Sequence, residues 1–149
     1  MLEERKVGTM RRLITALLAL AVAVCIFLPS ARYTEDEDSV LLARTIYALG
    51  KNESYATKLK LGSVVMNRLE NDWFPDDLGE VLSDPQQFPA GSRYDADSLR
   101  AAHELISGRR ALGSDALYYQ AADASAPWSD EYLVSSAGNY NFYCEDGNT

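Results

Sequence analysis

Hydrophobic and polar residues divide this 149-residue chain into one long apolar run and a longer region in which apolar residues recur periodically. The run extends from Leu13 to Leu28 without a charge and follows a basic flank at residues 1–12. Such a pattern is typical of a signal peptide or a membrane anchor. Because Pro29–Ala31 is only a passable cleavage site, we expect residues 13–29 to anchor the chain in the membrane, or to release a secreted protein if cleaved. Basic residues concentrate before the run, which places the remainder outside the cytoplasm.

Beyond residues 30–37, which we interpret as a linker, apolar residues recur with helical spacing in a domain at residues 38–149. A first helix is expected to end near Leu49, because Gly50 and Asn52 interrupt the pattern. Its apolar stripe is expected to contain Leu41, Tyr47 and Ala48.

The same spacing predicts two more helices. The second begins at Ser54 and runs to about Glu70, with a buried face formed by Leu61, Val64, Val65 and Leu69. Near its end, Arg68 is expected to pack against the helix terminus or to pair with an acidic side chain. The third helix runs from Asp95 to Ser107, with inward-facing residues Leu99, Ala102 and Ile106.

Between and after these helices the pattern changes to loops and strands. Residues 71–94 contain several helix breakers and are expected to form loops with one or two helical turns. Residues 116–120 and 140–144 are rich in strand formers and predict a small antiparallel sheet. The chain is therefore expected to be a single, mainly helical α+β domain behind an N-terminal membrane segment.

The charge of the exported region limits its partners. From Tyr33 onward there are 9 basic and 20 acidic residues, since five basic and two acidic residues precede it, which leaves a net charge of −11. Binding to nucleic acid through its phosphates is therefore not expected. Docking of this domain on an anionic lipid surface is not expected either. A neutral polymer such as a glycan remains compatible with this charge.

The two cysteines and the single histidine do not indicate a catalytic or metal site. Cys25 lies inside the apolar run, whereas Cys144 lies near the C-terminus, across the membrane if the run spans it. His103, the single histidine, lies beside the apolar stripe of the third helix, as a partly packed surface residue does. One histidine and one exported cysteine cannot form the usual ligand set of zinc. We expect no metal and no cofactor, and the sequence does not indicate an oligomeric state.

Several short motifs occur in a consistent order: Leu41–Ala48, Glu53–Tyr55, Val64–Arg68, Trp73–Pro75, Pro85–Phe88, Ala116–Tyr119 and Gly138–Tyr143. In this order they resemble the cell-wall hydrolase family typified by spore-cortex-lytic enzymes. No single motif is specific, but their succession is. The resemblance covers roughly residues 38–143.

The resemblance implies a lysozyme-like domain that acts on the glycan strands of peptidoglycan. In the family, a glutamate protonates the oxygen that joins muramic acid to glucosamine, and the muramic 6-hydroxyl can then close a 1,6-anhydro ring. One acid suffices for this lytic transglycosylase route, whereas ordinary hydrolysis uses two carboxyl groups.

The resemblance also suggests residues that contact the sugar. Gln87 is expected to offer its amide to a sugar while Phe88 packs beneath it; the alternative is a solvated Gln87 and a merely buried Phe88. Tyr118, Tyr119 and Trp128 are candidates for stacking on sugar faces, although aromatic residues in short strands more often belong to a core.

The chain departs from the family at the catalytic position. Where the family has Ala-Glu-Ala-Arg-Gly-Glu, this chain has Ala48-Leu-Gly-Lys-Asn-Glu53, so that Leu49 occupies the position of the catalytic acid. The second glutamate, Glu53, is retained. It is either a replacement acid or a structural residue at the start of the second helix.

Three hypotheses about function follow. The first is a membrane-anchored, extracytoplasmic cell-wall hydrolase or lytic transglycosylase with Glu53 as its acid. The second is a catalytically inactive relative that binds peptidoglycan without cutting it. The third is an exported interaction domain whose acidic surface meets a basic protein. Cleavage of purified peptidoglycan distinguishes the first hypothesis from the second, and binding to peptidoglycan distinguishes both of these from the third.

Overall fold

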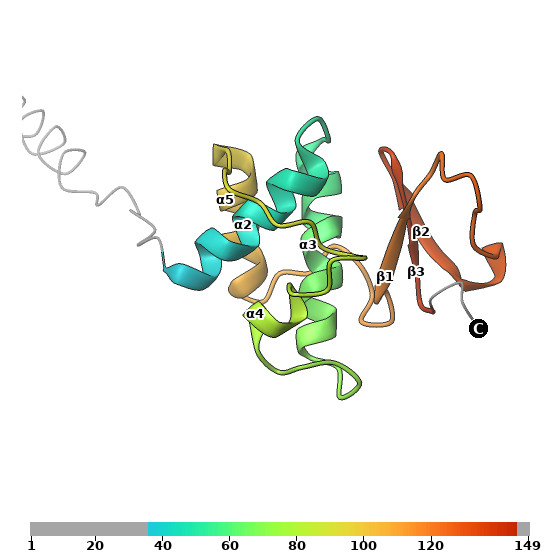
Figure 1. Cartoon of the computed structure of the whole chain (residues 1–149), viewed down its shortest axis with the longest axis horizontal. Coiled ribbons are helices and arrows are strands. Elements are labelled where there is room, and N and C mark those ends of the chain that lie inside the picture. The colour runs from blue at the N-terminus through green and yellow to red at the C-terminus, as the bar shows by residue number, and fades with distance from the viewer. Residues whose placement is uncertain (1–35, 146–149) are drawn as a thin grey trace, which may run out of the picture. The chain divides into compact units, whose positions relative to one another are not determined.

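The structure is a computed structural model that describes residues 36–145. Within this range the chain forms four α-helices, one short 3-10 helix and one three-stranded antiparallel sheet (Figure 1). The mainly helical α+β class with a small sheet is therefore confirmed. The predicted membrane segment at residues 13–29 lies outside the described residues. No helix within residues 36–145 combines the length and apolarity that crossing a membrane requires.

Helix α2 (Glu37–Gly50) begins at an Asp36 cap, whose carboxylate accepts a 2.6 Å hydrogen bond from the backbone N–H of Ser39. Its buried apolar residues are Leu42, Ala43 and Ile46. The predicted stripe of Leu41, Tyr47 and Ala48 is wrong: Ala48 is exposed and the other two are half-buried. Helical spacing alone is compatible with burial of either of two adjacent faces of α2. Packing against α3 and α5 buries the face that carries Ile46.

Helix α3 (Tyr55–Leu69) lies between the other helices and the sheet, and it confirms the predicted second helix with Ser54 as its cap. Gly62 is the point of closest approach. A Cβ atom at Gly62 would lie 2.3 Å from Leu105 Cδ1 and 2.8 Å from Ile46 Cδ1, so only glycine permits this packing of α3 against α5 and α2.

The remaining helices are capped by aspartates. Asp77 caps the single turn of α4 (Leu78–Val81), and Asp95 caps α5 (Ala96–Ile106). Two predictions for α5 are wrong: Ile106 is 39% exposed, and His103 is buried. Ile106 is the last residue of the helix, and its neighbour Leu105 is the one that enters the core, whereas His103 is only 7% exposed.

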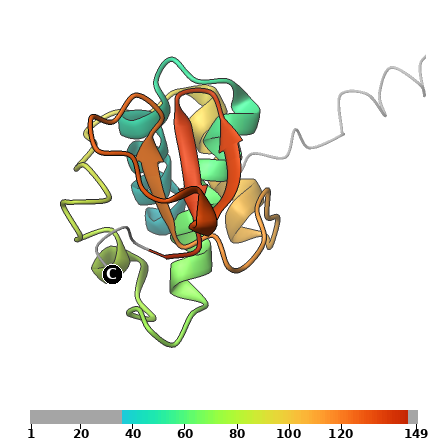
Figure 2. The ribbon, with the colours of Figure 1, turned by 90° about the vertical axis from the view of Figure 1, so that its right-hand side faces the viewer.

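The sheet contains one strand more than predicted. Strands β1 (Tyr118–Ala121) and β3 (Tyr140–Tyr143) pair in antiparallel fashion, as expected, and β2 (Leu133–Ala137) pairs with the other edge of β3. A 3-10 turn, η1 (Asp130–Tyr132), leads into β2. Figure 2 shows the sheet in front of the helices. The serines and alanine of β2 carry little strand propensity, so its pairing with β3 and a 2.8 Å bond from Lys60 to Ser135 account for its position.

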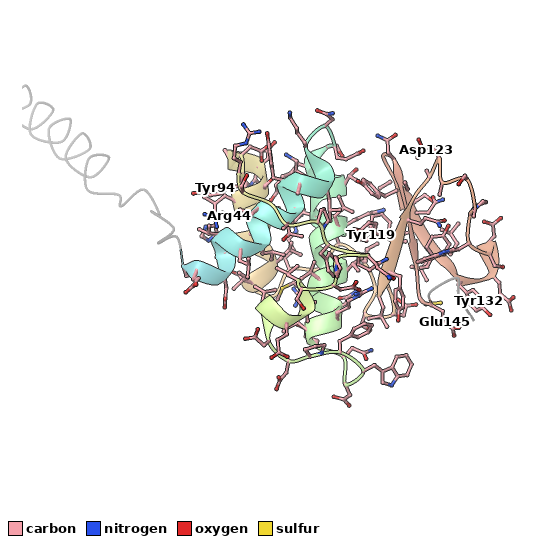
Figure 3. All side chains as sticks on the ribbon, viewed as in Figure 1. Arg44, Tyr94, Tyr119, Asp123, Tyr132 and Glu145 are labelled. Atoms are coloured by element: carbon pink, nitrogen blue, oxygen red, sulfur yellow. The ribbon has the colours of Figure 1, made fainter. Side chains whose placement is uncertain are left out.

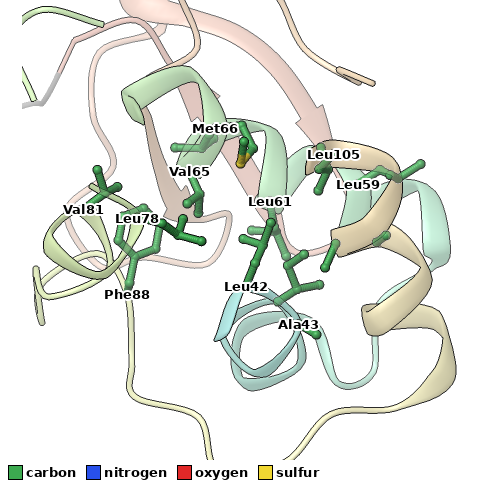
Figure 4. Packing of buried hydrophobic residues seen from close by; sticks show 14 of the residues in the cluster. Leu42, Ala43, Leu59, Leu61, Val65, Met66, Leu78, Val81, Phe88 and Leu105 are labelled. Atoms are coloured by element: carbon green, nitrogen blue, oxygen red, sulfur yellow. The ribbon is translucent and has the colours of Figure 1, made fainter. Parts of the chain in front are cut away.

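One hydrophobic core connects the helices with the sheet (Figure 4). Leu42 and Ala43 from α2, Leu61 and Val65 from α3, and Leu105 from α5 meet at its centre. Aromatic residues extend the core toward the sheet: Phe88, Tyr119 and Phe142.

Candidate functional site

Arg68, in the last turn of α3, is a buried cation that joins three segments of the chain. Its Nε donates to the carbonyl oxygen of Leu117 at 2.6 Å. Its Nη1 forms an ion pair with Asp84 at 3.3 Å, and its Nη2 donates to Gln87 Oε1 at 3.2 Å. Of the two alternatives for Arg68, pairing with an acidic side chain is thus the one observed. The bonds hold the loop at residues 84–88 against the beginning of the sheet.

Aromatic rings enclose the same guanidinium. Its central carbon lies 4.7 Å from the ring centre of Phe74, 4.8 Å from that of Tyr118 and 5.1 Å from that of Phe88. Burial lowers the pKa of Arg68, while the hydrogen bond and the charge of Asp84 act in the opposite direction. An arginine so placed stays charged at neutral pH and orders the residues around it.

A groove of about 380 Å³ opens above this cluster. We refer to it as the Arg68 groove; its lining residues are Arg68, Phe74, Asp84, Gln86, Gln87, Tyr118 and Trp128. Its polar groups are two amides, one carboxylate and the guanidinium of Arg68, and its walls are aromatic. Trp128 is held by edge contacts with Tyr118 and Tyr143, at ring distances of 6.3 and 5.1 Å. This combination offers hydrogen bonds and flat apolar faces to a ligand.

The five residues predicted to contact sugar gather at this groove but at different depths. Gln87, Tyr118 and Trp128 line it. Phe88, only 2% exposed, lies beneath Arg68, and its ring centre is 6.1 Å from that of Tyr119. Tyr119 is nearly buried between α3 and the sheet (Figure 3). Geometry thus places the three half-buried candidates where a ligand can reach them and leaves the two buried ones as the groove's support.

Leu49 lies near the C-terminal end of α2, beside the aromatic end of the core. Its side chain is half-buried against the hydrophobic cluster, and its carbonyl oxygen accepts a 2.7 Å hydrogen bond from the hydroxyl of Tyr140. The ring of Tyr140 lies 5.5 Å from that of Tyr119. A row of rings therefore connects Leu49 with Phe88 beneath the groove. The leucine itself offers no proton and no lone pair there.

Glu53 lies after the break between α2 and α3, and its carboxylate faces the turn that joins β2 to β3. Oε1 accepts hydrogen bonds from the Nδ2 of Asn139 at 2.7 Å and from its backbone N–H at 3.3 Å. A Cβ atom on Gly138 would lie 1.8 Å from Oε2. Gly138 is the first residue of the two-residue turn between β2 and β3, and its φ of 54° is one that glycine adopts readily in such turns. Glu53 therefore holds the hairpin against the start of α3.

Two tyrosines near Leu49 are donors at neutral pH. Burial raises the pKa of Tyr119, and the neighbouring Tyr140 adds to this effect. Burial also raises the pKa of Tyr140, together with the negative charge of Glu53. Both hydroxyls keep their protons through the physiological range, so neither acts as a base.

Metal chemistry finds no support in the part of the chain that the structure describes. Among residues 36–145, no group of three or more histidine, cysteine, aspartate and glutamate side chains comes together to hold an ion.

Sequence reasoning missed several groove residues, namely Phe74, Asp84 and Gln86. Phe74 and Gln86 belong to motifs that carried the family resemblance, which was the available signal. Asp84 precedes such a motif, and its role depends on a contact with Arg68 that is not local in sequence.

Comparisons with known proteins agree with this architecture. Residues 52–143 match the family described as Cell Wall Hydrolase. Spore cortex-lytic enzymes are similar in sequence: that of Halalkalibacterium halodurans is 28% identical over 99 residues, and that of Bacillus subtilis 30% over 99 residues. These alignments cover 62% of this chain but 30% and 32% of the relatives, so the chain spans about a third of their length.

Solved structures share the fold. The catalytic domain of the germination-specific lytic transglycosylase SleB from Bacillus anthracis superposes with a TM-score of 0.63 at 21% identity, over 74% of this chain and 98% of that domain. The catalytic domain of the Bacillus cereus SleB protein gives a TM-score of 0.62 at 22% identity, over 71% and 88%. With the family match covering more than half of its residues, this chain belongs to the cell wall hydrolase family.

Proposed function

We propose that this domain binds the glycan strands of peptidoglycan in the Arg68 groove, outside the cytoplasm. The observation that carries the proposal is the lining of that groove: amides of Gln86 and Gln87 beside the ring of Trp128. Amides pair with the hydroxyl and acetamido groups of amino sugars, and an indole face accommodates the apolar face of a sugar ring. Membership of the cell wall hydrolase family supports the same ligand.

Cleavage of the strand requires a general acid, and the position of the family's acid is central to the proposal. The resemblance aligns that acid with Leu49, whose side chain cannot donate a proton. Loss of general acid catalysis lowers a rate by roughly two to four orders of magnitude. A lytic transglycosylase reaction at the bond between muramic acid and glucosamine would therefore need another carboxyl group.

Glu53 is the retained glutamate, and its contacts favour a structural role. Its Oε1 accepts both hydrogen bonds from Asn139, and its Oε2 lies against the backbone of Gly138. An effective acid must instead carry its proton in an apolar pocket next to the leaving oxygen. We therefore propose binding without cleavage as the activity of the natural sequence. Anchoring through residues 13–29 remains a prediction.

The test compares binding and cleavage on purified peptidoglycan. Sedimentation with the polymer reports binding, and mass spectrometry of released muropeptides reports cleavage. The natural protein is expected to sediment and to release nothing. Leu49→Glu is expected to release fragments with anhydro ends, because it restores a carboxyl group at the family position. Leu49→Gln, of similar size but without an acidic proton, is the matched control and should stay silent.

Each hypothesis has a distinct outcome in this experiment. Release of fragments by the natural protein, abolished in Glu53→Gln, would make Glu53 the acid and refute binding without cleavage. Failure of the natural protein to sediment would refute glycan binding and support the acidic interaction domain. If Leu49→Glu sediments with peptidoglycan but releases no muropeptides, the absence of an acid at position 49 does not by itself explain the lack of cleavage.

A further inference from the structure

A second groove is not used by the proposed function so far. It has a volume of about 370 Å³, and residues that line it include Asn71, Trp73, Ser114, Asp115, Leu117 and Glu145. We refer to it as the Trp73 groove. The two grooves share no lining residue. Each contains one of the two tryptophans of the chain, Trp73 here and Trp128 in the Arg68 groove.

Trp73 is the most exposed large apolar side chain among residues 36–145, at 80% exposure. Its position is nevertheless defined by a rigid turn. Its backbone N–H donates to Asn71 Oδ1 at 2.9 Å, and the N–H of Phe74 donates to the carbonyl oxygen of Asn71 at 3.0 Å. Phe74 packs inward against Arg68, so the same turn presents the indole outward. The fold gains little from this indole, which leaves its surface available to a ligand.

The polar groups around Trp73 are suited to a neutral, hydroxyl-bearing ligand. Asn71, Ser114, Asp115 and Glu145 supply oxygen acceptors, and no lysine or arginine lines the groove. Sugar hydroxyls donate to such oxygens while the apolar face of the ring lies against the indole. The two carboxylates disfavour an anionic ligand by Coulomb repulsion. This chemistry matches an N-acetylglucosamine unit more closely than a phosphate or a free acid.

The two grooves are lined by the same two segments of the chain. Trp73 of one groove directly precedes Phe74 of the other, and Leu117 directly precedes Tyr118. Within the Arg68 groove, Phe74 and Tyr118 are in edge contact, with ring centres 6.0 Å apart. These shared segments are the reason to treat the two grooves as sites for one extended ligand.

We infer that the Trp73 groove is a second subsite for the glycan strand, where a neutral amino sugar stacks on Trp73. The inference rests on the proposed function and extends the bound length of the strand. It makes affinity depend on chain length, because a longer oligomer engages both tryptophans while a short one engages a single groove.

The two tryptophans allow each groove to be observed separately. Indole N–H signals of the ¹⁵N-labelled protein are followed by NMR during titration with short and long N-acetylglucosamine oligomers. Trp73→Phe and Trp128→Phe assign the two signals. Long oligomers are expected to shift both indole signals. Trp73→Ala should lower the affinity for long oligomers about tenfold, the equivalent of one aromatic stacking contact, and should lower the affinity for short oligomers less. Trp73→Phe, which keeps an aromatic face, should retain most of the affinity.

The outcomes separate this inference from the proposed function. If long oligomers shift the Trp128 signal but never that of Trp73, the second subsite is wrong while glycan binding stands. If neither signal moves at any length, the proposed function fails and the second subsite fails with it. The midpoint of urea unfolding of Trp73→Ala serves as the folding control and should match that of the natural protein, since the indole is 80% exposed. An equal loss for short and long oligomers would also overturn the subsite.

Discussion

Gly138→Ala tests whether Glu53 holds the β2–β3 turn. An alanine at a φ of 54° costs roughly 1–2 kcal/mol in backbone energy. Its Cβ would also lie 1.8 Å from Glu53 Oε2, so the carboxylate must move and lose its two bonds with Asn139. At this partly exposed position each bond contributes about 0.5 kcal/mol, the lower end of the usual range. The expected loss is therefore about 2–3 kcal/mol.

The assay is urea unfolding followed by tryptophan fluorescence, applied as a double-mutant cycle. In a Glu53→Ala background the clash with the carboxylate disappears and only Thr57 Oγ1, at 3.1 Å, stays close to the added Cβ. Gly138→Ala should then cost little more than the backbone energy of roughly 1–2 kcal/mol. Gly108→Ala is the matched control, because Gly108 has a φ of 98° but no atom within 4 Å of an added Cβ. Its cost should be the same with and without Glu53. Equal costs of Gly138→Ala in both backgrounds would refute the structural role of Glu53.

Three further predictions concern stability. Arg68→Ala should lower the free energy of unfolding by about 3–5 kcal/mol in urea titrations, because it removes a buried, paired cation; a loss below about 1 kcal/mol would contradict its central role. Gly62→Ala should destabilise by about 1–2 kcal/mol in the same assay, since overpacking against Leu105 exceeds the gain in helix propensity, and an unchanged midpoint would show that Leu105 yields freely. Burial alone would raise the pKa of Asp95, but hydrogen bonds, with that from Lys58 foremost, lower this pKa from 3.8 to about 2. The ionised Asp95 therefore stabilises the fold fully above about pH 4, and this stabilisation is lost as the pH falls toward 2. Asp95→Asn, which keeps a capping side chain, should flatten thermal stability between these pH values, and an unchanged slope would contradict the assignment.

The sequence by itself determined the elements that depend on local interactions. The cap at Ser54 and the apolar spacing of Leu61, Val64 and Val65 specify α3 within a few turns of chain, because capping and burial of one face act over that range. The same local interactions specify α5, which begins after the cap at Asp95. The order of short motifs was enough to identify the family, which the comparison with residues 52–143 then confirmed.

Tertiary structure alone decided which side chains meet. Strand β2 has weak local propensity and exists because β3 and Lys60 lie beside it. Packing against α3 and α5 chose between two adjacent stripes of α2 and buried Leu42 in place of Ala48. The contact between Glu53 and the turn at Asn139 joins residues distant in sequence, and no local pattern encodes it. The position of a carboxylate is readable from the sequence, but the partners that determine its chemistry are assembled only when the chain folds.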